Sequence, residues 1–153
     1  MPIKKLKDYL DQNRVKYVII KHSPAYTAQE VAASAHISGR AMAKVVMVEL
    51  DGSLAMAVLP ANRKVVLQDL REVTGSEDVD FASEEMFRDR FPDCELGAMP
   101  PFGNLYGMEV FVALALVSNT EIAFNAGSHE EIMKLAYADF ERLVKPYVMS
   151  FTT

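Results

Sequence analysis

Two apolar runs joined by an Asp-Gly pair constrain the fold of this chain more than any other feature. The runs are AKVVMVEL (43–50) and SLAMAVLP (53–60), with Asp51-Gly52 between them. An Asp-Gly pair between β-rich runs is a strong hairpin signal, because both residues tolerate the positive φ that a tight turn requires. Neither run alternates polar with apolar residues, which is typical of strands covered on both faces. The sequence therefore predicts a buried β-hairpin.

Helices are predicted before and after this hairpin. Thr27 and Glu30 have the spacing of a capping box, so a helix is expected to begin after Thr27. Gly75 is expected to end another helix in the left-handed conformation that glycine tolerates. The predicted helices are one at the start of the chain with Ile3, Leu6 and Leu10 on one face, and others over 28–36, 64–75 and 83–91.

Further strands are predicted over 16–22, 108–114 and 121–127. The segment 128–144 fits two interpretations, either one long helix or a strand over 132–135 followed by a helix from about Ala138. We favour the second, with a closing strand over 147–151. Hairpin-linked strands mixed with helices indicate an α+β fold, a mixed and mostly antiparallel sheet flanked by helices. One domain is expected to span 1–153.

The composition of the chain restricts the kinds of partner that the protein is expected to bind. No apolar run approaches the ~20 residues that a membrane-spanning helix needs, and the single cysteine fits a reducing compartment, so we expect a cytoplasmic protein without a membrane partner. The net charge of −5 argues against unspecific binding along a nucleic-acid backbone. It is compatible with binding the end of one nucleic-acid strand through a few positively charged side chains. Candidates in the first half of the chain are Lys21, Arg40, Lys44, Arg63 and Lys64.

Several familiar catalytic sites are absent from the sequence. There is no phosphate-binding glycine loop and no G-x-S-x-G elbow. The three histidines have no metal-ligand spacing, so we expect neither a metal nor a cofactor. Cys94 stands between Asp93 and Glu95, whose negative charges raise a thiol pKa, so it is a poor nucleophile.

Three features remain as candidate chemistry. Lys44 enters a strand of Val, Met and Ala, where an ammonium is costly unless it is exposed or meets an anion. The loop GAMPPFG (97–103) combines glycines, which allow close approach of backbone N–H groups, with rigid prolines. A turn with Gly127 and His129 follows the apolar run that ends at Phe124. Each feature alone also fits an ordinary structural role.

Together these features resemble the YbaK/EbsC family, which includes the editing domain inserted in bacterial prolyl-tRNA synthetases. The resembling segments are HSPAYTAQEVA (22–32), AKVVMVEL (43–50), AMAVLPANRKVVLQDLREVTG (55–75), GAMPPFGNLYG (97–107) and NAGSHEEIMKLAYADFERL (125–143). They occur in family order. The resemblance implies the fold of that editing domain and a hydrolase that supports translation fidelity by removing a small, wrong amino acid (Ala, Ser, Cys or Thr) from tRNA, with tRNA(Pro) or a related tRNA as the expected substrate.

The resemblance also implies site residues. The family's strand lysine corresponds to Lys44, its G-x-x-x-P spacing to Gly97 and Pro101, and its G-x-H turn to Gly127 and His129. Lys44 would anchor a phosphate or carbonyl, or orient the region of the α-amino group; His129 would position the terminal adenosine or assist proton transfer. The expected catalytic residues are thus Lys44, Gly97, Gly127 and His129. The candidate substrate-binding residues, some of which are also typical of cores, are Tyr26, Met47, Ala98, Met99, Pro101, Phe102 and Ser128.

Two alternatives stay open at this point. The domain can be a sensor that binds an aminoacyl-tRNA end, nucleotide or amino acid without turning it over, because no carboxylate base or nucleophile is marked. It can also hydrolyse another small ester or amide. The expected partners are the acceptor end of a mischarged tRNA and, for affinity, an aminoacyl-tRNA synthetase. The sequence does not indicate the oligomeric state.

Overall fold

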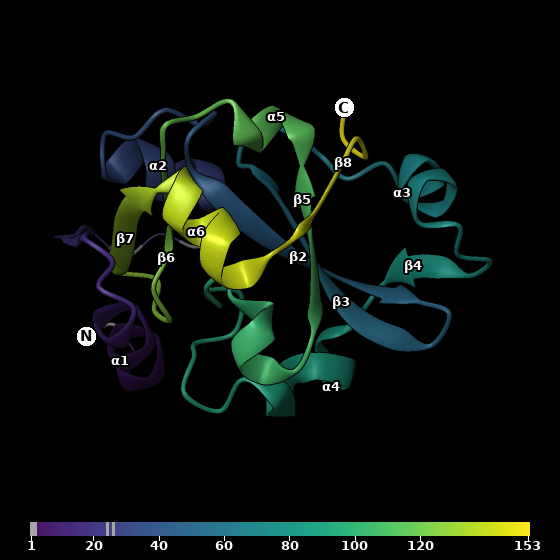
Figure 1. The fold of residues 1–153 in the computed structure, drawn as a ribbon, viewed down its shortest axis with the longest axis horizontal. Helices are drawn as coiled ribbons and strands as arrows, with labels where there is room; N and C mark the ends of the chain where they lie inside the picture. The colour runs from purple at the N-terminus through teal and green to yellow at the C-terminus, as the bar shows by residue number, and fades with distance from the viewer. Residues whose placement is uncertain (1–2, 24, 26) are drawn as a thin grey trace.

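The strands of the described chain form two sheets (Figure 1). The structure is a computed structural model and describes residues 3–23, 25 and 27–153. The three-stranded sheet has the order β1 (Tyr17–Lys21), β7 (Glu131–Ala136) and β6 (Glu121–Asn125). The five-stranded sheet has the order β4 (Val79–Phe81), β2 (Ala43–Leu50), β3 (Ser53–Pro60), β5 (Glu109–Ala113) and β8 (Tyr147–Met149).

Short helices surround these sheets. They are α1 (Lys4–Gln12), α2 (Ala28–Ser34), α3 (Leu67–Thr74), α4 (Glu84–Phe87), α5 (Leu114–Val117) and α6 (Tyr137–Val144), with 3-10 turns at Arg88–Arg90 and Gly103–Tyr106. The predicted capping box begins α2, since the Thr27 hydroxyl accepts a hydrogen bond from the Glu30 N–H at 3.1 Å. None of the helices among the described residues is long and apolar enough to cross a membrane.

The hairpin predicted at Asp51-Gly52 is confirmed. β2 and β3 pair antiparallel from Ala43 opposite Pro60 to Leu50 opposite Ser53, and both turn residues have positive φ. The expected α+β class is confirmed as well. The five-stranded sheet is mixed, because β5 runs parallel to both β3 and β8.

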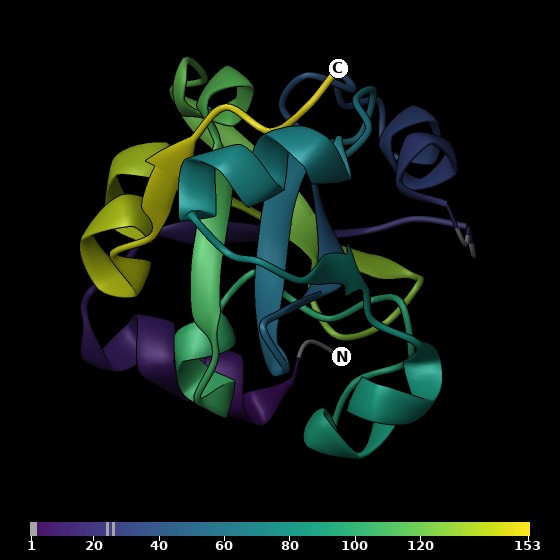
Figure 2. The same cartoon turned by 90° about the vertical axis from the view of Figure 1, so that its right-hand side faces the viewer.

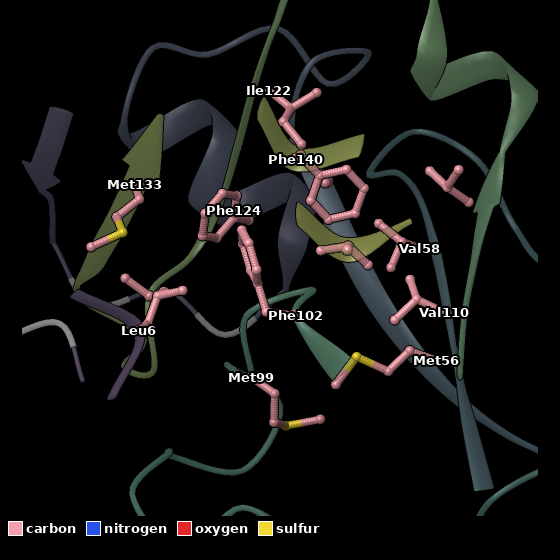
Figure 3. Close-up of a cluster of buried hydrophobic side chains, with 14 of the residues drawn as sticks. Leu6, Met56, Val58, Met99, Phe102, Val110, Ile122, Phe124, Met133 and Phe140 are labelled. Atoms are coloured by element: carbon pink, nitrogen blue, oxygen red, sulfur yellow. The ribbon is translucent and has the colours of Figure 1, made fainter. Parts of the chain in front are cut away.

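The main core lies between the two sheets and is closed by α1 and α6 (Figure 3). Phe102, fully buried, lies at its centre with its ring 5.5 Å from the rings of both Phe124 and Phe140. Leu6 and Leu10 of α1 are fully buried too, as their helical spacing predicts. This packing fixes the loop that carries Phe102 against the three-stranded sheet.

The outer faces of the sheets carry two smaller clusters. Leu70 of α3 packs with Val48 and Phe111 on the outer face of the five-stranded sheet, and Figure 2 shows α3 lying across its strands. α2 packs against the other sheet, where Val31 and Ala32 join Met42, Ala61, Ala123 and Ile132. The hairpin strands are therefore covered on both faces, as their unbroken apolar runs predict.

Some predicted boundaries were wrong. The helix expected over 64–75 begins only at Leu67, because Val65 bridges Thr152 and the Val66 N–H donates to the Phe151 carbonyl. The helix expected over 83–91 is four residues of α4 followed by a 3-10 turn. For 128–144 the favoured interpretation is confirmed, with β7 followed directly by α6.

Phe102→Ala is expected to lower the free energy of unfolding by about 3–5 kcal/mol, since it leaves a cavity among packed aromatic rings. Phe81→Ala is the matched control, because Phe81 is 50% exposed on strand β4. It is expected to cost less than about 1 kcal/mol. Urea unfolding followed by far-UV circular dichroism measures both, and equal losses would contradict the assigned core.

Candidate functional site

The loop at 97–103 and the turn at 127–129, which the resemblance assigns to one site, meet through their backbones. The Glu95 N–H donates to the Gly127 carbonyl at 2.7 Å, and the Gly127 N–H donates to the Ala98 carbonyl at 3.0 Å. Gly127 has φ +101°, and a Cβ added there would lie 2.5 Å from Ile3 Cγ2. Glycine is therefore required at 127 both for its conformation and for the close approach of α1.

His129 fastens the same two loops together. Its ring Nε2 lies 2.9 Å from the Leu96 carbonyl oxygen, and its backbone N–H donates to Glu95 Oε2 at 2.8 Å. Because a carbonyl oxygen only accepts, Nε2 carries the proton and donates. The side chain is 9% exposed, so the imidazole is oriented by the loop that it supports. This geometry gives His129 a positioning role toward residues 95–97.

The predicted loop is mostly buried. Gly97 is exposed, whereas the residues that follow it, Ala98, Met99, Pro100, Pro101, Phe102 and Gly103, are buried. The Ala98 N–H donates to the Glu95 carbonyl, while the Gly97 N–H has only the Met99 sulfur at 3.3 Å. Of the backbone N–H groups in this loop and the turn, those of Ala98 and Gly127 are therefore used internally, and that of Gly97 makes only a weak contact.

The Lys44 side chain lies on the face of β2 that points away from the main core, whereas the buried part of the 97–103 loop lies in that core. Side chains alternate along β2, so Met47 points into the main core with Met99, and Lys44 points to the opposite, outer face. There its ammonium lies 3.4 Å from the Ala61 carbonyl oxygen, to which Gln29 of α2 also donates at 3.3 Å. The structure thus joins Lys44 to α2 rather than to Met47 and Phe102.

The outer edge of β2 is interrupted beside Lys44. Met42 bridges Ala123 of β6, and pairing with β4 begins only at Val48. Between these points the described residues provide no strand partner on that edge. Since Met42 and Ala123 both face the α2 cluster, alternation places Lys44 and Asn125 on that same face, two residues further along each strand. The Asn125 Oδ1 is buried and has no hydrogen-bond partner among the described residues.

The charge of Lys44 is not neutralised. Burial of the half-buried side chain lowers the pKa of Lys44, and the nearby positive charge of Lys64 lowers it further. Within the described chain no carboxylate lies in ion-pair range of its ammonium. A partly desolvated ammonium without a counter-ion is expected to attract an anion or a polarised carbonyl.

The remaining predicted residues fall into two groups. Met47, Met99 and Phe102 are packed in the main core at 4%, 5% and 0% exposure. Ser128 is partly exposed in the turn, where its hydroxyl accepts from the Glu130 N–H at 3.4 Å. Tyr26 lies outside the described residues. Among the residues that are described, no three His, Cys, Asp or Glu side chains are grouped as metal ligands.

Comparison with known proteins identifies the family. A family described as "Aminoacyl-tRNA editing domain" matches residues 22–143, which include Lys44, the loop at 97–103 and the turn at 127–129. The chain belongs to this aminoacyl-tRNA editing family. The YbaK-type resemblance is thereby confirmed, and deacylation of aminoacyl-tRNA is the activity of the family.

Individual relatives agree with this assignment. The prolyl-tRNA editing protein ProX of Acetoanaerobium sticklandii is 27% identical, over 89% of this chain and 86% of its own. The crystal structure of hypothetical protein APE2540 has a TM-score of 0.87 at 16% identity, covering 98% of this chain and all of that one. A candidate trans-editing enzyme for prolyl-tRNA synthetase has a TM-score of 0.81 at 15% identity, covering 98% and 96%. At these identities the two structures show the editing-domain fold alone.

Sequence reasoning missed three residues that the editing domain uses to build this region. Glu95 binds the His129 backbone, Gln29 shares the Ala61 carbonyl with Lys44, and Asn125 lies beside Lys44 on the same face. Only Asn125 had a sequence signal, since it ends a strand immediately before the predicted turn. The other two depend on pairing between distant segments, which spacing does not reveal.

Gly127→Ala is expected to lower the free energy of unfolding by about 3 kcal/mol or more, from a left-handed backbone plus a clash with Ile3. Gly75→Ala is the control: it also has positive φ (+70°) but no atom within 4 Å of the added Cβ, so about 1–2 kcal/mol is expected. In a double-mutant cycle, Ile3→Ala should recover the part of the lost free energy of unfolding that comes from the clash with Ile3. Additive losses would mean that Ile3 and the turn do not touch.

Proposed function

We propose that this editing domain is a trans-acting deacylase that hydrolyses the ester between a small, wrong amino acid and tRNA. The expected amino acid is Ala, Ser, Cys or Thr, and the expected carrier is tRNA(Pro) or a related tRNA. The observation that carries the proposal is the ammonium of the half-buried Lys44 side chain, which has no carboxylate partner within the described chain and lies in the segment that the family matches. The 27% identity to ProX supports the choice of substrate class.

In the proposed reaction, water adds to the ester carbonyl carbon and the bond to the ribose oxygen breaks. The proton of the water passes to that ribose oxygen, which releases the free amino acid and the tRNA. The carbonyl oxygen becomes an oxyanion on the way, and donors fixed in advance lower that barrier most effectively. Lys44 binds either this oxygen or the terminal phosphate, and the Gly97 N–H, which has only a weak contact with the Met99 sulfur, is a backbone donor that the loop offers.

Water is the favoured nucleophile because the protein side chains nearby are unsuited. Burial raises the pKa of the Cys94 thiol, so little thiolate forms at neutral pH. The His129 Nε2–H is engaged with the Leu96 carbonyl. We therefore assign activation of the water to the neighbouring ribose hydroxyl of the substrate, with the protein supplying position and charge.

A sensor remains the second candidate function, because the Ala98 and Gly127 donors are consumed within the fold. A panel of tRNAs mischarged with Ala, Ser, Cys or Thr separates the two. Release of amino acid above the uncatalysed rate supports the deacylase. Tight binding of a non-hydrolysable aminoacyl-adenosine analogue without release from any charged tRNA would establish the sensor.

Lys44→Met is expected to reduce deacylation at least ~100-fold, the usual cost of losing one donor at a developing oxyanion. Stability should be unchanged or higher, because the lowered pKa of Lys44 means that its charged form is less favourable in the fold than in the unfolded chain. Initial rates and urea unfolding on the same preparation measure both. Gln29→Leu is the control, because Gln29 donates to the same Ala61 carbonyl that Lys44 contacts. Wild-type rates in the Lys44→Met protein would contradict the proposal.

Lys64→Gln is expected to move the alkaline limb of the rate profile to higher pH. Lys44 acts as an ammonium, so the rate falls as pH rises through its pKa, and removal of the neighbouring positive charge raises that pKa. Rates over pH 7 to 11, corrected for spontaneous ester hydrolysis, measure the limb. Arg88→Gln, distant in the acidic part of the chain, serves as control. A limb that moves to lower pH would contradict the coupling.

A further inference from the structure

A second polar hollow lies close to Lys44, at the end of the sheet where β3 finishes. It has a volume of about 490 Å³ and is lined by Arg40, Pro60, Asn62, Arg63, Ala115, Ser118, Asn119 and Thr120. Its lining contains two guanidinium groups, several neutral hydrogen-bonding side chains and no carboxylate. Its lining residue Ala115 belongs to α5, which Figure 1 shows at the top of the view. This chemistry fits a phosphate group.

The hollow lies near Lys44, because Ala61 stands between the lining residues Pro60 and Asn62. The Lys44 ammonium contacts the carbonyl of Ala61, and Asn62 and Arg63 follow in the chain. On the other wall, a Cβ on Gly39 would lie 3.3 Å from Asn62 Cβ, so the segment before β2 packs against the segment after β3. A strand of nucleic acid whose end lies at Lys44 can therefore place a preceding phosphate in this hollow.

The backbone of Arg40 is fixed before any ligand binds. Its N–H donates to Ser38 Oγ at 3.3 Å, and its carbonyl accepts from Asn119 Nδ2 at 2.9 Å. The Arg40 side chain is exposed and has no acidic partner among the described residues. Arg63 is oriented by its hydrogen bond to the Thr153 carbonyl. Two guanidinium groups that line one hollow suit bidentate binding of phosphate oxygens.

Charge is segregated along the chain in a way that favours this end. Residues 31–48 and 52–68 contain Arg40, Lys44, Arg63 and Lys64 and no acidic residue. Residues 69–95 contain ten acidic and three basic residues, and they form α3, β4 and α4, at the right and bottom of Figure 1. A polyanion is therefore attracted to the first region and repelled by the second.

We propose that this hollow binds a backbone phosphate of the single-stranded acceptor end of tRNA, next to the aminoacyl ester at Lys44. The inference rests on the proposed function for the ester's location. The acceptor end is favoured over a free nucleotide because the hollow lies near Lys44 but is lined by other residues, as binding of a phosphate that precedes the ester along one strand requires.

Arg40→Gln tests this inference, with Arg63→Gln as a second variant and Arg88→Gln, exposed in the acidic region, as matched control. With mischarged tRNA, KM is expected to rise about tenfold for Arg40→Gln with little change in kcat. With an aminoacyl-adenosine ester, which lacks the phosphate, both arginine variants should equal wild type. Lys44→Met should lose activity on mischarged tRNA.

Binding measurements keep the inference separate from catalysis. The affinity for uncharged tRNA is expected to fall for Arg40→Gln and Arg63→Gln, and the slope of log affinity against log salt to decrease by about 0.7 for each lost contact. If no substrate is hydrolysed, the deacylase proposal fails, but the tRNA affinities still show whether the hollow binds a phosphate of tRNA. Wild-type tRNA affinity in both variants, or a loss confined to AMP and inorganic phosphate, would overturn the inference.

Discussion

The backbone pairing between residues 95–98 and the turn at Gly127 is the contact on which the candidate site depends. Two short hydrogen bonds join segments about thirty residues apart, and His129 closes the junction from the side chain of the turn. Phe102 then anchors the loop from the core side, between the rings of two other phenylalanines. The exposed Gly97 is thus presented by a scaffold that is rigid at both ends, which is what a preorganised donor needs.

Lys44, in contrast, contributes little to the stability of the fold. Its ammonium is partly desolvated, repelled by Lys64 and held only by a carbonyl at 3.4 Å, so the isolated fold gains little from it. A group that is unfavourable in the folded state and yet placed at an interruption of a sheet edge is typical of a site that is completed by its ligand. The aminoacyl-tRNA editing domain therefore retains an unfavourably placed charge where substrate is proposed to bind. The apolar side chains of β2 pack in the cores on the two faces of the sheet.

The sequence predicted what is local. The hairpin at Asp51-Gly52 and the capping box at Thr27 were confirmed, because both patterns act within a few residues. The meeting of the loop with the turn was anticipated through family resemblance. Which face of β2 carries Lys44 relative to Met99 was not, since it depends on sheet pairing across the molecule. Met and Phe side chains offered as pocket walls belong to the core for the same reason: burial is set by tertiary contacts that residue type does not specify.

A net charge of −5 opposes RNA binding only when charge is averaged over the whole chain. Outside residues 69–95 the protein has thirteen basic and eleven acidic residues, so the deficit belongs to one region, α3 to α4. Because screening confines such fields to about 10 Å at ordinary salt, the end near Arg40 and Lys44 presents its own local potential. In the proposed complex the acidic region restricts contact to a short length of the polyanion. If the domain acts on one ester bond at a strand terminus, as proposed, that restriction adds specificity, since long unspecific contacts along a duplex would compete with the end.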